Sequence, residues 1–295
     1  MSFAADVKGE LCRAPLNRKC CAQAEAYGVL LYCNTFARGE VRIMTENDAF
    51  AKRLPQLFKK AFRVTFDRLP EGEGKRIFSI TDPRKLSAID QAVGSGPEDL
   101  ALHINFAVLE ESCCRLSFLR GAFLAGGSVT DPRKGYHLEL TTSHLSASRE
   151  MVALMREMEL EPKAAMRHGN AVIYFKQSHY IEDFLTMLGA PVCAMGIMEA
   201  KVEKDLRNGV NRRVNCETAN LTKVVDAAQE QLAAIRLLQR NGLLETLPAK
   251  LRQTAMLRVE NPEATLQELA EMTEPPLTKS AMNHRMRKII AYSKQ

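Results

Sequence analysis

The sequence contains no run of 18 or more apolar residues, and its amino terminus lacks the basic-then-apolar pattern of a secretory signal. We therefore predict neither a membrane span nor export, and we expect a cytoplasmic protein. The chain has 295 residues, of which 46% are hydrophobic. That length and composition predict about two globular domains with ordinary buried cores.

The sequence also lacks any CxxC pair, the spacing typical of small zinc sites. The two adjacent pairs, Cys20-Cys21 and Cys113-Cys114, are each poorly placed to share one tetrahedral metal. Disulfides are unexpected in the cytosol. We therefore predict reduced, structural thiols, and neither a metal nor a cofactor. The eight cysteines are Cys12, Cys20, Cys21, Cys33, Cys113, Cys114, Cys193 and Cys216.

Acidic residues are absent after Glu274, although the last 21 residues contain five basic ones. This end alone carries a charge of +5, compared with +6 for the whole chain. A basic end is typical either of a solvated helix face or of a surface that binds phosphates. Both interpretations remain open on charge alone.

What is present is an internal repeat. CCAQAEAYGVLLYCNTF at 20–36 aligns with CCRLSFLRGAFLAGGSV at 113–129 at an offset of 93 residues. The adjacent cysteines coincide, and Gly28 falls on Gly121. Both stretches have helical periodicity, and a glycine inside a helix indicates a close helix approach. We predict that the chain contains one structural unit twice.

The periodicity that follows each repeated helix supports this duplication. In the first half we predict a helix at 20–33, a strand at 40–45, a helix at 48–62 capped by Asn47, a hairpin of strands at 64–66 and 76–80, and a helix from Asp82-Pro83. In the second half we predict a helix from 113, a strand at 136–141, a helix capped by Ser146 or Ser148, strands at 163–166 and 171–175, and a helix at 178–188.

A duplicated unit that opens with a small-residue helix resembles the LAGLIDADG homing endonucleases. The stretch LRGAFLAGG at 119–127 matches their nine-letter motif position by position. The resemblance implies two central helices on a pseudo-twofold axis, with an antiparallel sheet from each half. In those nucleases the penultimate motif residue is an acid that holds a divalent metal.

The metal-binding acids of those nucleases are absent here. Cys33 and Gly126 occupy the corresponding positions, and neither is a ligand for Mg²⁺. Asp131 precedes a proline and is predicted to be a turn residue. His137 and Glu139 alternate on one face of a strand, which favours two solvent-facing side chains over a metal pair. We therefore predict a catalytically inactive scaffold.

The region after Pro191 changes to helical periodicity. We predict a helix at 196–208 that ends near Asn208-Gly209, then helices at 221–238 and 248–259. Between the first two lies a polar and basic cluster: Asn211, Arg212, Arg213, Asn215, Asn220 and Lys223. It is interpreted either as a loop that caps the next helix through Thr218 or Asn220, or as a hinge segment that contacts phosphates.

The carboxy-terminal end predicts a helix-turn-helix at about 265–291. Thr265 and Glu268 form a capping box for a short first helix, and Pro275-Pro276 turn the chain. The last helix has Met282, Met286 and Ile289 on one side for docking. Its other side is suited to phosphates and base edges, and the predicted DNA-binding residues are Thr278, Lys279, Ser280, Asn283, His284, Arg285, Arg287 and Lys288.

Taken together, the chain resembles the WhiA family of bacterial regulators over essentially its full length. The most specific segments are NRRVNCETANLTK, LPAKLRQTAMLRVENPEATLQELAEM and LTKSAMNHRMRKI. The resemblance implies transcription control linked to sporulation or cell division in Gram-positive bacteria. It also implies an α+β fold in which a duplicated LAGLIDADG-like α/β unit precedes an all-α helix-turn-helix domain.

The predicted boundaries are 1–93 and 94–190 for the two repeats, 191–216 for a linker and 217–295 for the carboxy-terminal domain. The leading hypothesis is a non-enzymatic, sequence-specific regulator that binds double-stranded DNA and is associated with the nucleoid. A second transcription factor or an RNA polymerase component is a further candidate partner. The alternatives are an active metal-dependent LAGLIDADG endonuclease, or an amino-terminal module that senses a ligand or protein while only the tail binds DNA.

Overall fold

The computed structural model describes residues 2–37, 39–70, 74–95 and 101–294. The chain divides into two compact units, 1–204 and 205–295, and each has its own hydrophobic core. Among the described helices, none combines the length and the apolar character needed to cross a membrane.

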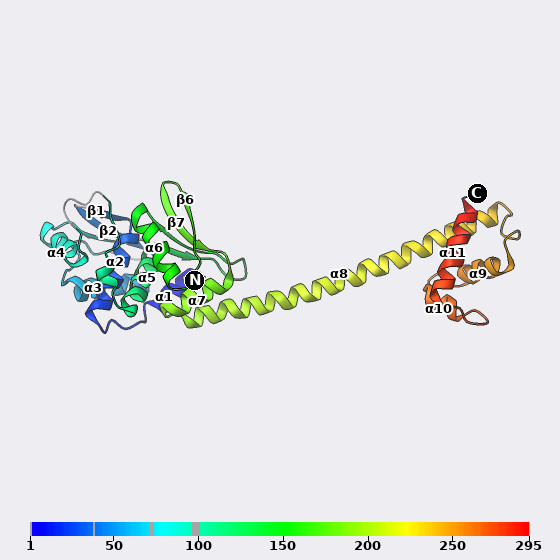
Figure 1. The fold of residues 1–295 in the computed structure, drawn as a ribbon, viewed down its shortest axis with the longest axis horizontal. Helices are drawn as coiled ribbons and strands as arrows, with labels where there is room; N and C mark the ends of the chain where they lie inside the picture. The colour runs from blue at the N-terminus through cyan, green and yellow to red at the C-terminus, as the bar shows by residue number, and fades with distance from the viewer. Residues whose placement is uncertain (1, 38, 71–73, 96–100, 295) are drawn as a thin grey trace. The chain divides into compact units, whose positions relative to one another are not determined.

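The first repeat forms a three-stranded antiparallel sheet in the order β1-β2-β3, with helices beside it (Figure 1). The side chain of Asn47 accepts the Phe50 amide at 2.9 Å and thereby caps α3, as predicted. α1 has no counterpart among the predicted elements. The elements are α1 (Phe3–Leu11), α2 (Lys19–Tyr32), β1 (Thr35–Ala37), β2 (Glu40–Thr45), α3 (Asp48–Phe62), β3 (Arg76–Ile80) and α4 (Pro83–Val93).

The predicted strand at 64–66 is wrong. β3 pairs with β2 instead, and the only bridge near this segment joins Arg68 to Ser79 among the residues described. Val64 and Phe66 are buried, and the Phe66 ring lies 4.8 Å from that of Phe58. Their apolar alternation therefore comes from packing into the core and not from a place in the sheet.

The second repeat forms a four-stranded antiparallel sheet in the order β4-β5-β7-β6. The predicted caps Ser146 and Ser148 are wrong because α6 begins one residue after His144, so both serines lie inside the helix. The elements are η1 (Phe106–Leu109), α5 (Ser112–Gly126), β4 (Gly127–Val129), β5 (Leu138–Thr142), α6 (Leu145–Glu157), β6 (Lys163–Arg167), β7 (Asn170–Phe175) and α7 (Ser178–Leu188).

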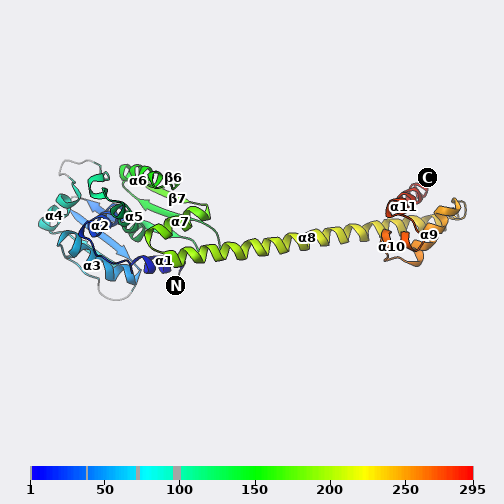
Figure 2. The ribbon, with the colours of Figure 1, turned by 60° about the horizontal axis from the view of Figure 1, so that its bottom comes forward.

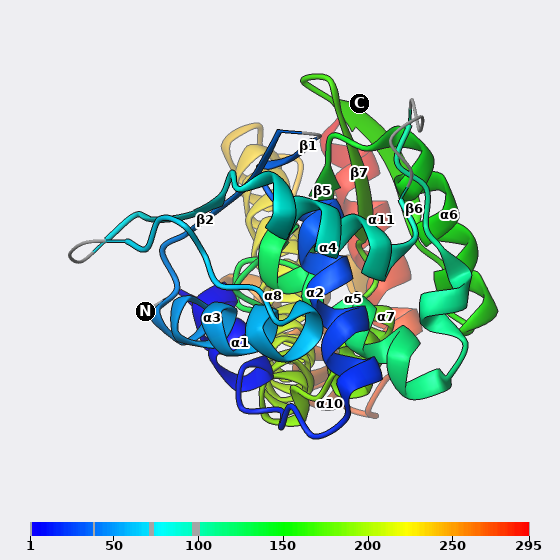
Figure 3. The same ribbon diagram turned by 90° about the vertical axis from the view of Figure 1, so that its left-hand side faces the viewer.

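The two repeats meet along α2 and α5, which run side by side between the sheets (Figures 1 and 3). A Cβ added at Gly28 would lie 2.0 Å from the Phe118 carbonyl oxygen. A Cβ added at Gly121 would lie 1.9 Å from the Glu25 carbonyl oxygen. Because 118 and 121 are 25 and 28 plus the repeat offset of 93, the two contacts are reciprocal. This reciprocity is the pseudo-twofold relation that the repeat predicts.

A buried ionic network joins the repeats at the same seam. Glu25 of α2 accepts two hydrogen bonds from Arg53 of α3, at 2.6 and 2.9 Å. Arg120 of α5 reaches the same carboxylate at 3.4 Å. Because the Glu25 side chain is 1% exposed, removing either arginine would leave charge in the core with less compensation.

The helix α8 (Pro191–Arg240) runs without interruption through the residues where a helix end and a loop are predicted. The predictions of an end near Asn208-Gly209 and of a capping loop at 211–223 are therefore wrong. This stretch contains no proline, and Gly209 costs a helix only about 1 kcal/mol. The Thr222 hydroxyl donates to the Thr218 carbonyl at 2.9 Å, so this polar side chain bonds within the helix.

The second unit gathers three shorter helices around the last turns of α8 (Figure 2). Gly242 has a φ of +70° and follows the end of α8, as predicted. The helices are α9 (Ala249–Glu260), α10 (Leu266–Glu271) and α11 (Lys279–Ser293). Its core contains Ile235, Leu238, Leu247, Leu251, Ala255, Leu269, Ala270, Met282, Met286 and Ile289.

Candidate nucleic-acid interface

The helices α10 and α11 are joined by a turn that local hydrogen bonds hold in place. The capping box of α10 is confirmed: the Thr265 hydroxyl accepts the Glu268 amide at 3.3 Å, and Glu268 accepts the Thr265 amide at 2.6 Å. In the turn, the buried Thr273 hydroxyl donates to the Ala270 carbonyl at 2.8 Å. Leu277 then donates its amide to the same carbonyl at 2.9 Å. These bonds fix the direction in which α11 leaves the turn.

The docking side of α11 is as predicted. Met282, Met286 and Ile289 are all at most 1% exposed and pack against α9 and α10. Thr278 caps the helix by accepting the Ala281 amide at 3.2 Å. Burying one side of this helix leaves the opposite side turned outward.

The outward side of α11 contains most of the residues predicted to contact DNA. Asn283 is half-buried, and the others on this side are exposed: Thr278, Lys279, Ser280, His284, Arg287 and Lys288. Within the described part of the chain, no ion pair joins Lys279, Arg287 or Lys288 to a carboxylate. The side therefore offers unneutralised cations together with amide and hydroxyl groups, which is the chemistry that phosphates and base edges require.

Arg285 lies on another side of the helix. Its guanidinium donates to the Thr254 hydroxyl of α9 at 3.4 Å, and the residue is half-buried. The structure thus brings together the other seven predicted contacts and places Arg285 between α11 and α9.

The amino-terminal end of α11 has an unusual charge. Its first turn contains no acidic residue and begins with Lys279, although the positive end of a helix dipole is stabilised by negative charge. A cation there costs a few tenths of a kcal/mol when nothing offsets it. A bound phosphate would accept free amide hydrogens and neutralise both the dipole and the lysine.

Arg258 is a buried residue that sequence reasoning did not single out. It is 1% exposed, and its guanidinium donates to Gln231 of α8 at 3.0 Å and to the Ala264 carbonyl at 2.5 Å. Burial lowers its pKa. Arg258 follows Ala255 by three residues and so lies on the same buried side of α9 as Leu251 and Ala255. This helical spacing is the sequence signal that predicts a buried side chain at position 258. Arg258 fixes the segment that leads into α10.

The predicted secondary contacts, Asn211, Arg212, Arg213, Asn215, Asn220 and Lys223, are all exposed on α8. Helical spacing distributes them around the helix. Asn211 and Asn215 share one face, whereas Arg213 and Asn220 share another. The segment is thus an exposed helical surface and not a loop.

The positions that hold metal in the nucleases have a different role here. The Cys33 thiol lies 3.2 Å from the Leu30 carbonyl and 3.1 Å from the Thr35 carbonyl, and burial raises its pKa to about 12. A Cβ at Gly126 would lie 2.5 Å from the Thr141 carbonyl oxygen and 3.0 Å from that of Tyr32. The backbone therefore fills the space that a carboxylate at position 126 would need.

The other acids considered at this end have local partners. The Asp131 side chain accepts the Arg133 amide at 2.9 Å, as expected of a turn residue. Glu139 accepts from Arg167 at 3.1 Å and lies 2.9 Å from His137. Both side chains of the His137–Glu139 pair are 28% exposed, so they are partly buried and not fully solvent-facing.

The helix α1 packs against α3, α5 and β4, beside the carboxy-terminal end of α5. Between them is a hollow of ≈ 520 Å³, whose lining includes Lys8 of α1, Asn34 and Gly127. Burial lowers the Lys8 pKa to about 8. The end where the nucleases hold their metal is thus covered in part by an additional helix.

Two family models match the chain. The WhiA LAGLIDADG-like domain matches residues 115–207, and the WhiA C-terminal HTH domain matches residues 210–292. The second match includes both the exposed cluster on α8 and the α10–α11 pair.

Relatives are similar over almost the whole chain. Proteins described as "Probable cell division protein WhiA" are 37% identical in Ruminiclostridium cellulolyticum and 38% identical in Desulforudis audaxviator, covering 98% of this chain and 96% of each relative. The crystal structure of full-length DUF199/WhiA from Thermatoga maritima has a TM-score of 0.61 at 24% identity, covering 100% of this chain and 98% of that one. The structural likeness confirms the fold predicted for both parts of the chain.

Proposed function

The chain belongs to the WhiA family, and from this premise we propose that it is a sequence-specific DNA-binding regulator of transcription that acts in cell division or sporulation. We propose that α11 reads bases in the major groove while the capped α10 lies against the backbone. The proposed partner is double-stranded DNA, and the proposed location is the cytoplasmic nucleoid.

The observation that carries the proposal is the outward side of α11. Lys279, Arg287 and Lys288, which have no carboxylate partner among the described residues, stand beside Ser280 and Asn283 on a helix whose other side is buried. Arg and Lys pair with guanine edges, and an asparagine amide pairs with adenine. An ordinary surface helix would show intermixed acids, but α11 contains none.

The amino-terminal unit is proposed to be a non-catalytic scaffold. Support comes from the neutral thiol at Cys33 and from the closed space at Gly126, because phosphodiester cleavage by this fold requires metal-holding carboxylates there. We further propose the division into repeats 1–93 and 94–190, a helical connection at 191–216 and a DNA-binding domain at 217–295.

The test uses double-stranded DNA selected from a random pool by the wild-type chain. The Arg287→Ala/Lys288→Ala variant is expected to bind this DNA at least about tenfold more weakly in a mobility-shift assay, since removing one base or phosphate interaction costs about 1–3 kcal/mol. The slope of log affinity against log salt is also expected to become shallower by about one for each phosphate that the variant no longer neutralises.

The matched control is Lys250→Ala, which removes an exposed cation from α9 in the same unit. It is expected to leave affinity within about twofold, because an exposed cation away from the interface adds little. Unchanged affinity in the Arg287→Ala/Lys288→Ala variant, with selection still yielding a specific sequence, would refute the assignment of α11 as the reading helix.

A further inference from the structure

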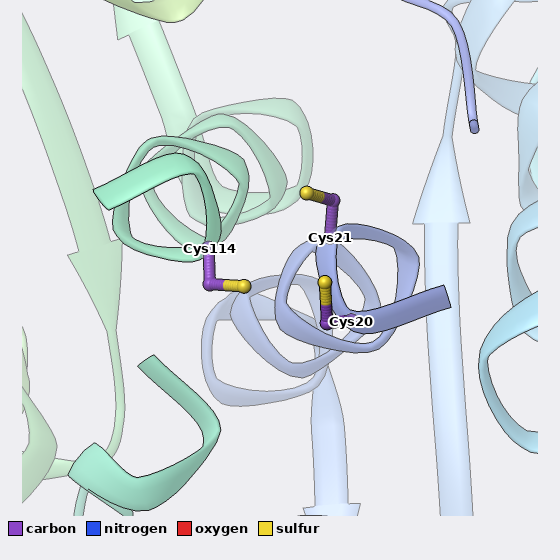
Figure 4. Close-up of side chains that lie close together, drawn as sticks. All are labelled: Cys20, Cys21 and Cys114. Atoms are coloured by element: carbon purple, nitrogen blue, oxygen red, sulfur yellow. The ribbon is translucent and has the colours of Figure 1, made fainter. Parts of the chain in front are cut away.

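The packing of α2 against α5 brings the two adjacent cysteine pairs to one place. The Sγ atoms of Cys20, Cys21 and Cys114 all lie within 4.8 Å of one another, and their thiols face each other between the first turns of the two helices (Figure 4). All eight thiols of the chain are free. Spacing in the sequence disfavours a metal on either pair alone, whereas the fold places residues 93 positions apart in contact.

Cys113 adjoins this trio. It directly precedes Cys114 in the first turn of α5. The Arg18 guanidinium donates to its sulfur at 3.8 Å. Cys113 therefore offers a fourth thiol next in sequence to the trio, with the Arg18 cation beside it.

The helix ends at this cluster lack their usual partners. The cap positions of α2 and α5 are Arg18 and Glu111, and neither side chain makes a capping hydrogen bond. The cysteines occupy the first turn of each helix, where free amide groups and the positive dipole end stabilise thiolates. The positive ends of two helix dipoles thus lie beside the same group of sulfurs.

We propose that Cys20, Cys21, Cys113 and Cys114 bind one zinc ion that joins the two repeats. Zinc bound by four thiolates is tetrahedral with Zn–S distances of about 2.3 Å, so its ligand sulfurs are about 3.8 Å apart. The Sγ atoms of Cys20, Cys21 and Cys114 already lie within 4.8 Å of one another, so movements of about 1 Å in these side chains would bring them to that spacing. Thiolate ligands select zinc over magnesium or calcium.

The charge and access of the site suit this ion. On binding, the four thiols release their protons to solvent, and zinc with four thiolates carries a net charge of −2. Arg18 and the two helix ends offset that charge. Cys20 is exposed and Cys114 is buried, so the ion has a path from solvent to an enclosed ligand.

This site is distinct from the one that the nucleases use. Cys20 and Cys33 lie at opposite ends of α2, which at 1.5 Å per residue places them about 20 Å apart. Where the nucleases hold a catalytic metal this chain has a neutral thiol, and the cluster of Cys20, Cys21 and Cys114 lies at the other end of the same helices. Such an ion would have a structural role.

The test loads the full chain with Zn²⁺ under reducing conditions, removes free metal by gel filtration and measures zinc by mass spectrometry. About one zinc per chain is expected for the wild type, with a raised Tm that falls when a chelator removes the metal. Cobalt substitution is expected to give the absorption bands of tetrahedral thiolate coordination. The Cys20→Ser and Cys114→Ser variants are each expected to lose the bound metal and the Tm shift.

The matched control for the exposed Cys20 is Cys216→Ser, which removes an exposed thiol outside the cluster and should retain one zinc. Since Cys20 is exposed, its serine variant remains informative if Cys114→Ser fails to fold. Less than about a tenth of one zinc per wild-type chain, retention of zinc by folded Cys20→Ser, or disulfides among these cysteines in the chain as isolated would each overturn the proposal.

Discussion

At the scale of single residues, the contact between α2 and α5 leaves no room for a side chain at Gly28 and Gly121. The backbones of α2 and α5 approach so closely at Gly28 and Gly121 that a methyl group would collide with main-chain oxygens. Main-chain atoms of two packed helices cannot move aside as a side-chain tip can. The closeness of the repeats therefore depends on these two positions.

The Gly121→Ala substitution is expected to lower the free energy of unfolding by about 3 kcal/mol or more, because the added Cβ would lie 1.9 Å from the Glu25 carbonyl oxygen. Urea denaturation with circular dichroism measures this change. The control is Gly9→Ala in α1, where no atom of the described residues lies within 4 Å of the added carbon. It should be neutral or stabilising by up to about 1 kcal/mol. Equal effects of the two substitutions would contradict the close approach.

Lys8 predicts a pH dependence of stability. Its pKa is lowered from 10.5 to about 8 by burial, so the charged form is disfavoured in the folded state. Below about pH 8, Lys8 is charged in both states and its burial lowers the stability of the folded protein by the full amount. Between about pH 8 and 10.5 the folded protein loses the Lys8 proton while the unfolded chain keeps it, so stability rises with pH. Above pH 10.5 the unfolded chain also loses the proton, and the destabilisation is gone. Lys8→Met is therefore expected to stabilise the protein at pH 7 by on the order of 1 kcal/mol, after allowance for partial exposure.

The measurement is the free energy of unfolding of Lys8→Met and wild type at several pH values from 7 to 11. The difference between them should shrink toward zero across the interval from about pH 8 to 10.5. Lys8→Arg is the control, since arginine stays charged throughout and should not recover stability as the wild type does. A constant difference between Lys8→Met and wild type would exclude titration of Lys8 in this range.

Residue-level prediction succeeds where periodicity decides the outcome. Met282, Met286 and Ile289 are buried as their spacing requires, and the Thr265–Glu268 capping box is formed. The charge of Arg285 groups it with the DNA contacts, but the helical spacing places it beside α9. The type of a residue indicates which groups its side chain could bind. The direction in which the side chain points depends on the position of the residue around the helix axis.

At the scale of elements, most helices and the longer strands follow from the sequence, and the exceptions have physical causes. The strands β1 and β4 have three residues each, too few for an alternation to be recognised. The polar residues that cluster at 211–223 favour a loop in the sequence. Asn, Thr and Lys are nevertheless tolerated on exposed helical positions, and only proline would have excluded a helix.

The Asn215→Pro substitution distinguishes a helix from a loop at this place. In a continuous α8 it removes a main-chain hydrogen bond and clashes with the preceding turn, which costs about 3 kcal/mol or more of helix stability. Hydrogen exchange is expected to show loss of protection around residue 215. Asn215→Ala is the control and should retain or increase protection. Unchanged protection in the proline variant would restore the loop interpretation.

At the scale of the whole molecule, the duplication could be predicted from the sequence because the two halves align at a constant offset. Reciprocal contacts between α2 and α5 confirm it. The cluster of Cys20, Cys21 and Cys114 could not be predicted from spacing, because its members belong to different repeats and meet only after the helices pack. The α1 helix buries only Val7 and Leu11, which are too few for a helical stripe to be recognised.

The division into two units predicts where DNA affinity resides. The fragment 1–204, which has its own core, is expected to show no sequence-specific binding and no steep salt dependence. Titrating it and the full chain with the selected DNA at several salt concentrations measures both properties. Specific binding by the fragment would assign a second reading surface to the amino-terminal unit.

The closed space at Gly126 has a consequence for protein engineering. An aspartate or glutamate introduced there would meet the main-chain oxygens of Thr141 and Tyr32 before its carboxylate could reach a metal. Building a carboxylate metal site at this position would thus require coordinated movement of a strand and a helix, which a single substitution does not supply.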